Sequence, residues 1–217
     1  MNSNLDPGAR ADSLNELLSA AGLPALDPQA TAKLDEYLAL ILRWNARMNL
    51  TAVRDARGIR SRHFVESIAC ARHLPAGIAS LLDFGTGAGL PGIPIALCRP
   101  EISVTLAESQ TKKAAFLQEA VRTLKLNSRV FADRAENLPH GEFDCVTLRA
   151  VDNMAHAVAA GSNLVKTEGY LAVMTTIGEL PRVHKAAGDG FRWLDPFPLP
   201  GAEQAILALA SRTGQTA

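Results

Sequence analysis

The stretch Leu81-Leu-Asp-Phe-Gly-Thr-Gly-Ala-Gly-Leu-Pro-Gly92 decides the fold. Its apolar start predicts a β-strand that runs directly into a turn with four glycines, and Pro91 suits the first turn of the helix that follows. Glycine adopts positive φ and lets a ligand approach the main chain without a Cβ in the way. In a doubly wound α/β sheet, the ligand lies over such a turn, at the carboxyl ends of the strands. The stretch therefore predicts a ligand site in a parallel sheet.

Strands and helices alternate after residue 78. This alternation predicts a mainly parallel sheet with helices on both faces. Two further candidate strands, 191–195 and 204–211, flank a proline-rich turn and suit an antiparallel hairpin at one sheet edge. The predicted strands of the alternating part are 80–84, 102–107, 129–132, 143–148 and 170–174, and the predicted helices are about 92–98, 111–125, 152–165 and 178–187.

The first 77 residues show only helical periodicity. We expect residues 1–77 to form an N-terminal helical extension and residues 78–217 to form the domain that contains the sheet. Asp12 is expected to cap the first helix, and Asp27-Pro28 to open the second. The predicted helices cover about 12–21, 27–47 and 59–73.

Length and composition exclude several classes of protein. With 217 residues, of which 47% are hydrophobic and 20% charged, the chain is typical of a globular protein and not of a disordered or fibrous one. Lys plus Arg and Asp plus Glu number 22 each, which argues against binding nucleic acid over the whole surface but leaves room for a local basic patch. No apolar run approaches the ~20 residues of a membrane span, so we expect no membrane association.

The cysteines predict a reducing compartment. Cys70, Cys98 and Cys145 are odd in number, stand among apolar neighbours and have no metal-ligand spacing. The first ten residues are polar and lack the apolar centre of a secretory signal. We therefore expect a cytoplasmic protein without a bound metal.

The spacing of the glycines favours a nucleoside ligand without a bound phosphate. Dinucleotide sites carry Gly-x-Gly-x-x-Gly, whereas position 90 is leucine here, and no Gly-Lys-Ser/Thr follows as in a P-loop. The loop contains no Lys or Arg. The next predicted strand leads to Glu108, whose carboxylate can accept hydrogen bonds from both ribose hydroxyls. The pattern favours S-adenosylmethionine over NAD, and the alternative is a tight turn that binds no ligand.

Several polar residues near the predicted site allow two interpretations each. Asp83 could order the glycine loop or contact the methionine amine through water. Arg149 could bind the methionine carboxylate or be an ordinary surface arginine. Asn45, Asn49 and Thr51 could line the target pocket or cap helix ends.

A local basic cluster offsets the neutral total charge. Its six arginines lie within twenty residues, with Asp55 the only acid among them. Such a cluster could track a phosphate backbone, and the alternative is a solvated helix face. Trp44 in the same segment could stack on a base or belong to the core. The arginines are Arg43, Arg47, Arg54, Arg57, Arg60 and Arg62.

Three sequence blocks carry a family resemblance. They are Arg43-Trp44-Asn45-Ala-Arg-Met48-Asn49-Leu50-Thr51-Ala52 with Arg62-His63-Phe64-Val65-Glu66-Ser67, the stretch from Asp83 to Pro94, and Ala135-Glu136 with Leu148-Arg149-Ala150. Together they resemble the bacterial small-subunit rRNA (guanine-N(7)-)methyltransferases, the GidB or RsmG family, over about residues 40 to 175. Generic methyltransferases carry only the glycine block.

The resemblance implies a class I (Rossmann-like) S-adenosylmethionine-dependent methyltransferase fold with a mainly parallel sheet. It implies S-adenosylmethionine as the cofactor and, as the target, N7 of a guanine in small-subunit rRNA, within a small subunit or its precursor. A purine nitrogen with an in-plane lone pair bears no proton, so no general base is required. The substrate-positioning candidates are Arg149, Asn49 and Arg62. The expected cofactor-binding residues are Asp83, Gly85, Gly87, Gly89, Leu90, Glu108, Ala135, Glu136 and Arg149.

The sequence departs from the family at two places. Family members usually carry Lys-Gly after the fifth strand and Arg-His in the last strand, where this chain has Thr175-Thr176 and Gln204-Ala205. Fewer cations on the substrate side leave two alternatives open. One is a methyltransferase of the same fold that acts on a small molecule or a protein. The other is a non-catalytic RNA-binding or ribosome-assembly module.

Overall fold

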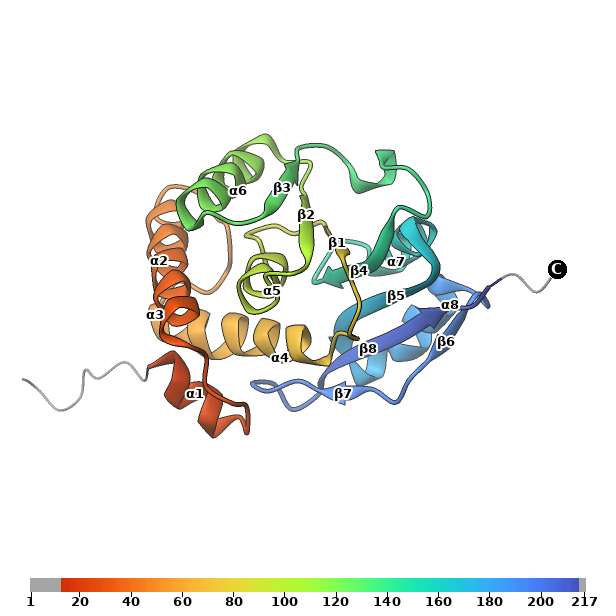
Figure 1. Ribbon diagram of the computed structural model, residues 1–217, viewed down its shortest axis with the longest axis horizontal. Coiled ribbons are helices and arrows are strands. Elements are labelled where there is room, and N and C mark those ends of the chain that lie inside the picture. The colour runs from red at the N-terminus through yellow and green to blue at the C-terminus, as the bar shows by residue number, and fades with distance from the viewer. Residues whose placement is uncertain (1–12, 215–217) are drawn as a thin grey trace, which may run out of the picture.

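A computed structural model describes residues 13–214 and shows an eight-stranded sheet with helices on both faces (Figure 1). The strand order is β3-β2-β1-β4-β5-β8-β6, and β7 pairs with β8 outside this path. Strands β1 to β5 run parallel, whereas β8 is antiparallel to its neighbours. The strands are β1 (Ser80–Phe84), β2 (Ser103–Ala107), β3 (Ser128–Phe131), β4 (Phe143–Arg149), β5 (Val165–Thr176), β6 (Phe191–Trp193), β7 (Phe197–Pro198) and β8 (Ala205–Arg212).

The sheet separates two hydrophobic clusters because side chains alternate along each strand. In β1, Leu81 faces one cluster, whereas Leu82 and Phe84 face the other. Helices α1, α2, α4, α5 and α6 cover the first cluster, and α7 and α8 cover the second. The α-helices are α1 (Leu14–Ala20), α2 (Pro28–Asn45), α3 (Ala56–Gly58), α4 (Val65–His73), α5 (Gly92–Cys98), α6 (Thr111–Leu124), α7 (Met154–Leu164) and α8 (Leu180–Ala187), and the shorter or wider turns are η2 (Ile59–Phe64), η3 (Ala135–Asn137) and η4 (Ile177–Glu179).

The strand order places a crevice at the end of β1. From β1 the chain passes to β2 and β3 on one side of the sheet and then continues with β4 and β5 on the other side. In open α/β sheets, ligands bind outside the carboxyl ends of the strands at such a reversal. The glycine turn that joins β1 to α5 lies at this point.

The predicted α/β fold with a mainly parallel sheet is confirmed. The strand over 80–84 and the helix over 92–98 are observed with the predicted bounds. The helix expected over 59–73 is in fact two segments, a π-helical η2 followed by α4. Apolar periodicity did not reveal the change, because both segments bury one side of the chain against the same cluster.

The largest difference between a predicted and an observed element boundary is at β5. β5 begins at Val165, ahead of the predicted 170–174, because Val165 pairs with Phe143 across a register shift. Asp12, the expected helix cap, lies outside the described residues, and the side chain of Ser13 accepts a hydrogen bond from the Glu16 N–H at the start of α1. The antiparallel arrangement of the two last candidate strands is observed as β6 and β8.

The N-terminal helices share a hydrophobic cluster with the sheet. Leu34 of α2, Ile68 of α4 and Leu81 of β1 are fully buried and belong to the same cluster. The division of the chain into a helical extension (1–77) and a methyltransferase domain (78–217) stays a prediction. The shared cluster means that the helices before residue 78 pack directly against the sheet.

Helix α2 reaches the glycine turn through Tyr37. Asp27 caps the helix by accepting a hydrogen bond from the Ala30 N–H at 2.9 Å, and Pro28 occupies its first turn. Tyr37 is fully buried, stacks on Phe64 at 5.4 Å between ring centroids, and donates its hydroxyl proton to the carbonyl of Ala88. A buried carbonyl of the glycine turn is thereby satisfied from the N-terminal helices.

Replacement of this tyrosine tests the link. Tyr37→Phe is expected to lower the free energy of unfolding by about 1–3 kcal/mol, because the Ala88 carbonyl loses its buried partner. Urea denaturation measures the difference. Tyr170→Phe is the matched control, since no hydrogen bond of the Tyr170 hydroxyl is found within residues 13–214. Equal effects of the two substitutions would contradict this role of Tyr37.

Candidate functional site

The glycine turn bends sharply over the end of β1. Gly85, Gly87 and Gly89 have φ values of +63°, +58° and +87°. A Cβ at Gly89 would lie 2.5 Å from Ile93 Cδ1, whereas a Cβ at Gly87 would meet no atom within 4 Å. Gly89 is therefore required by packing inside the protein, and Gly87 leaves its outer side open to a ligand.

Asp83 holds this turn from below. Its carboxylate is fully buried and accepts hydrogen bonds from Thr86 Oγ1, from the Gly92 N–H at 2.7 Å and from Thr147 Oγ1 at 3.1 Å. Burial raises the pKa of Asp83 to about 6, although these hydrogen bonds favour the charged form. Of the two roles considered from the sequence, the geometry supports ordering of the loop, because Asp83 does not line the cavity above it.

Glu108 borders the turn from the end of β2. Only 6% of the residue is exposed, and its two carboxylate oxygens accept hydrogen bonds from the Gly87 N–H at 3.1 Å and the Gln110 N–H at 2.7 Å. An ionised carboxylate offers about four acceptor positions. The remaining positions can accept hydrogen bonds from a ligand hydroxyl.

A cavity of about 940 Å³ opens above the glycine turn. This volume lies in the range of roughly 300–1,000 Å³ that is usual for small-molecule sites. The walls come from the ends of the parallel strands, from the segment that joins α2 to α4, which contributes Thr51 and His63, and from Glu66 in the first turn of α4. Thr175, Thr176 and Ala205 line it at the far end of β5 and the start of β8.

Most of the residues predicted from the sequence lie around this cavity. Asp83, beneath the turn, and Gly89, within the turn, are not among the residues that line the cavity. Asn49 also does not line it, and instead its side-chain oxygen accepts a hydrogen bond from Arg54 Nη2 at 2.7 Å. The predicted residues that do line the cavity are Arg62, Gly85, Gly87, Leu90, Glu108, Ala135, Glu136 and Arg149.

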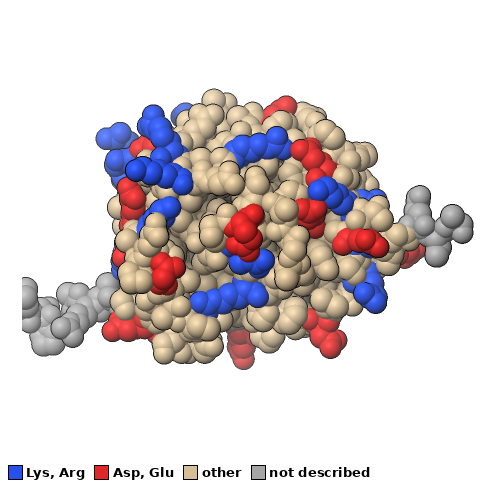
Figure 2. All heavy atoms as spheres, in the orientation of Figure 1, with Lys and Arg blue, Asp and Glu red and all other residues tan. Residues whose placement is uncertain are grey.

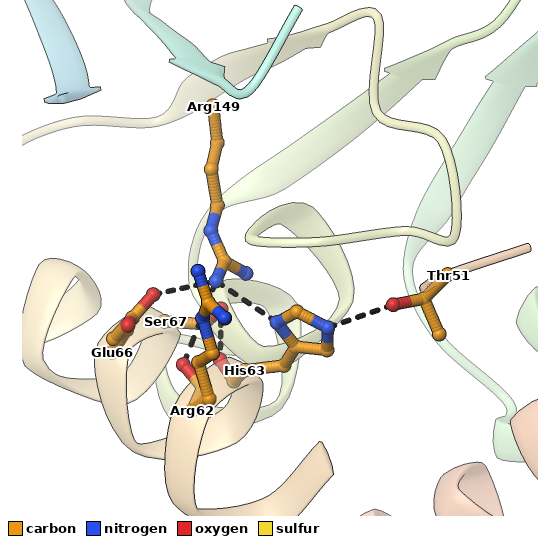
Figure 3. A network of polar contacts seen from close by, with 6 residues as sticks. All are labelled: Thr51, Arg62, His63, Glu66, Ser67 and Arg149. Carbon is orange, nitrogen blue, oxygen red and sulfur yellow. Dashed lines mark hydrogen bonds and ion pairs between the residues drawn. The ribbon is translucent and has the colours of Figure 1, made fainter. Parts of the chain in front are cut away.

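Arg149 is the centre of a polar network between the sheet and the N-terminal helices (Figure 3). It ends β4, and its Nη2 donates to Glu66 Oε2 at 2.5 Å and contacts His63 Nδ1 at 3.0 Å. The side chains of Arg149 and Glu66 are only 12% and 8% exposed. Burial raises the pKa of Glu66, while the charges of Arg149 and Arg62 oppose this shift. The buried ion pair fixes the orientation of the guanidinium group.

His63 and Glu66 were not predicted as site residues. They stand three positions apart, His63 in η2 and Glu66 in α4, so both side chains lie on the same side of the chain. The combination of this spacing with a distant arginine gives no signal in a single sequence. π-helical turns occur often at functional sites, and this one carries two lining residues, Arg62 and His63.

Asn45 of the first sequence block is hydrogen-bonded entirely within the protein. This buried side chain accepts hydrogen bonds from the N–H groups of Leu50 (2.9 Å) and Thr51 (3.2 Å) and donates to the carbonyls of Thr51 and Val53, both at 3.1 Å. All four hydrogen-bonding positions of the amide are used. Asn45 therefore shapes the loop that presents Thr51 to the cavity.

Other members of the first block are engaged inside the protein. Trp44 packs edge-on against Phe116 at 5.7 Å between centroids and donates to Glu119 Oε2 at 3.0 Å, so it belongs to the helix packing. Arg43 pairs with the same glutamate, and Arg60 pairs with Asp35 at 2.7 Å. Part of the predicted basic cluster is thus neutralised by acids on other helices. Figure 2 likewise shows acidic and basic side chains interspersed over one face of the molecule.

Residues 13–214 contain neither a metal-binding cluster nor a membrane-spanning helix. These residues contain no group of three or more His, Cys, Asp or Glu side chains that could hold a metal ion. None of their helices is both long enough and apolar enough to cross a membrane.

The strand order and the glycine turn define a class I methyltransferase fold. The solved structure of a SAM dependent methyltransferase from Aquifex aeolicus superposes with a TM-score of 0.58 at 17% identity, covering 72% of this chain and 93% of that chain. At this identity the likeness concerns the fold alone.

The family follows from sequence comparison. Residues 30–185 match the family described as rRNA small subunit methyltransferase G, and the chain belongs to this family. The ribosomal RNA small subunit methyltransferase G of Xanthomonas euvesicatoria pv. vesicatoria is 44% identical over 184 residues, which cover 82% of this chain and 85% of the relative. The protein of the same name from Stenotrophomonas maltophilia is 42% identical over 203 residues, with 90% and 91% covered. The resemblance inferred from the three blocks is thereby confirmed.

The buried carboxylate under the glycine turn predicts a specific pH dependence. Because the pKa of Asp83 is about 6 in the folded chain and 3.8 ordinarily, its contribution to stability is complete below about pH 3.8 and is lost as the pH rises through about 6. The difference between the unfolding free energies of the wild type and Asp83→Asn should therefore fall by about 3 kcal/mol between acid and neutral pH.

Urea denaturation at a series of pH values measures this difference. Asp195→Asn, at an exposed aspartate, serves as the matched control. Wild-type and Asp83→Asn profiles that remain parallel over this pH interval would show that burial does not set the pKa of Asp83.

Proposed function

We propose that this chain transfers a methyl group from S-adenosylmethionine to N7 of a guanine in small-subunit rRNA. The observation that carries the proposal is the open glycine turn beside Glu108, at the strand reversal, in a chain that belongs to the rRNA small subunit methyltransferase G family. The substrate is expected within a small subunit or its precursor, and the place of action is the cytoplasm.

The residues around the cavity fit S-adenosylmethionine. Gly87 leaves the main chain open, Glu108 has acceptor positions for the ribose hydroxyls, and the Ala135-Glu136 turn lines the same cavity. The guanidinium of Arg149 keeps N–H groups beyond those bound to Glu66 and His63, and these can contact the methionine carboxylate or the target base. When bound, S-adenosylmethionine supplies a methyl group that its sulfonium already activates.

The task of the protein in this reaction is orientation. N7 of guanine carries a lone pair and no proton, so the chain needs no general base. Burial raises the pKa of Cys70 to about 12 and also raises the pKa of Cys145, so both thiols stay neutral. Neither cysteine lines the cavity. Fixing the base in line with the methyl group can lower the barrier by about 7–11 kcal/mol. The rigid walls at Arg149 and at the Asn45-supported loop suit this task.

A second candidate is a methyltransferase of the same fold that acts on a small molecule or a protein. Thr175, Thr176 and Ala205 line the cavity, next to Glu179, and bring no positive charge to that end. Salt distinguishes the two candidates, because binding to rRNA weakens steeply as the salt concentration rises, whereas binding of a small neutral substrate does not.

Methylation of isolated small subunits tests the proposed substrate. Subunits from a bacterial strain that lacks this enzyme family are incubated with labelled S-adenosylmethionine and the protein. We expect label in the rRNA, recovered after nuclease digestion as 7-methylguanosine by mass spectrometry. Label in ribosomal protein, or none, would contradict the proposal, and binding to the subunits without any turnover would favour a non-catalytic assembly module.

A bulky residue in the glycine turn should block the cofactor. Gly87→Val is expected to weaken S-adenosylmethionine binding at least about tenfold in calorimetry, because the added side chain occupies the open side of the turn. Gly141→Val is the matched control, since Gly141 has a similar φ of +63° but does not line the cavity. Similar cofactor affinities for the two variants would contradict the assignment of the glycine turn.

A further inference from the structure

The network at Arg149 determines which ring nitrogen of His63 carries the proton. A guanidinium group has N–H donors and no acceptor, so His63 Nδ1, at 3.0 Å from Arg149 Nη2, must accept. Burial and the charges of Arg149 and Arg62 lower the pKa of His63 to about 4, so the ring is neutral at neutral pH. The single proton of the neutral ring is then on Nε2.

This proton is directed at Thr51. His63 Nε2 lies 2.8 Å from Thr51 Oγ1, and the dashed lines of Figure 3 follow the chain of contacts from Arg149 through His63 to Thr51. Since Nε2 carries the proton, the threonine oxygen accepts this hydrogen bond. The N–H of Val53 donates to the same oxygen at 3.2 Å.

Thr51 is therefore left with a proton to donate. A hydroxyl oxygen has two acceptor positions and one proton. Both acceptor positions are used, and within residues 13–214 the hydroxyl proton has no acceptor of its own. Thr51 lines the cavity, so this proton is available to a ligand there.

The position of this donor is firmly set. Asn45 binds both the N–H and the carbonyl of Thr51, and the loop it shapes runs on to Val53. Because the backbone around Thr51 is held in place, its hydroxyl cannot reorient to fit a different ligand. A donor held in this way discriminates between ligands.

On the basis of the proposed function, we infer that Thr51 donates its hydroxyl proton to O6 of the target guanine and so selects guanine over adenine. Beside N7, guanine presents the acceptor O6, whereas adenine presents an amino group that only donates. N7 itself must keep its lone pair for the methyl group, which leaves O6 as the partner of the hydroxyl. An adenine in the same place would set its amino protons against the proton of Thr51.

Substitution of Thr51 and replacement of O6 in the target guanine together test the contact. Small subunits are reconstituted from rRNA transcripts in which a minor fraction of guanosine is replaced by 6-thioguanosine, because sulfur is a weaker acceptor than oxygen. The wild type is expected to methylate targets with O6 about tenfold faster than targets with sulfur. Thr51→Val keeps the shape of the side chain without the hydroxyl, so it should methylate about tenfold more slowly and show no preference for O6. Thr51→Ser keeps the hydroxyl and should retain both the wild-type rate and the preference.

Controls separate this inference from the proposed function. Thr167→Val, at an exposed position of β5 away from the cavity, should behave as the wild type. Binding of S-adenosylhomocysteine, measured by calorimetry, should be the same for all variants. If the wild type makes no 7-methylguanosine, the proposed function fails. If the wild type methylates but has no preference for O6, if Thr51→Val keeps that preference, or if Thr51→Val loses cofactor affinity, the role of Thr51 is wrong while the function stands.

Nitrogen-15 NMR of the histidine rings gives a test that does not depend on activity. His63→Gln identifies the signals of His63 by their loss. We expect a neutral ring with the proton on Nε2 at neutral pH. A proton on Nδ1 would mean that Thr51 donates to Nε2 and has no proton left for the base, which would overturn the inference.

Discussion

The buried carboxylate of Asp83 is the interaction on which the site depends. Its oxygens accept hydrogen bonds from Thr86 in the turn, from the Gly92 N–H at the start of α5 and from Thr147 in β4. The carboxylate therefore joins three elements. The turn can therefore close tightly over β1 while its outer side stays open at Gly87. Tyr37 adds a fourth attachment from α2, through the Ala88 carbonyl. The glycine turn is thus held in place by Asp83 beneath it and by Tyr37 of α2.

The cavity depends equally on the helices that precede the sheet. The sheet supplies the glycine turn, Glu108 and Arg149, where we propose that the nucleoside cofactor binds. The wall opposite them consists of the Asn45-supported loop and the π-helical turn. The buried pair of Arg149 and Glu66 joins the two halves.

The sequence predicted the fold and much of the cofactor side for local reasons. Strand-helix alternation has short-range causes, and β1, α5 and the glycine turn between them were predicted within their observed bounds. The prediction was weaker where long-range contacts decide. The sequence leaves Trp44 between base stacking and the core, because its position depends on Phe116 and Glu119 in a distant helix. The basic cluster is predicted from arginines that lie close together in the sequence. The acids that pair with two of them, Glu119 with Arg43 and Asp35 with Arg60, lie on other helices.

The amino-acid sequence by itself determined the class of sheet, the place of the ligand turn and the family, because these depend on residue order and on conformations that only glycine adopts with ease. Tertiary structure alone decided which polar side chains meet. Arg149 and His63 are brought together by packing of α4 and η2 against the strand ends, and only their contact determines the tautomer of the histidine and the direction of the Thr51 proton. The direction of a hydrogen bond depends on which groups are neighbours in space, and the amino-acid sequence alone does not specify those neighbours.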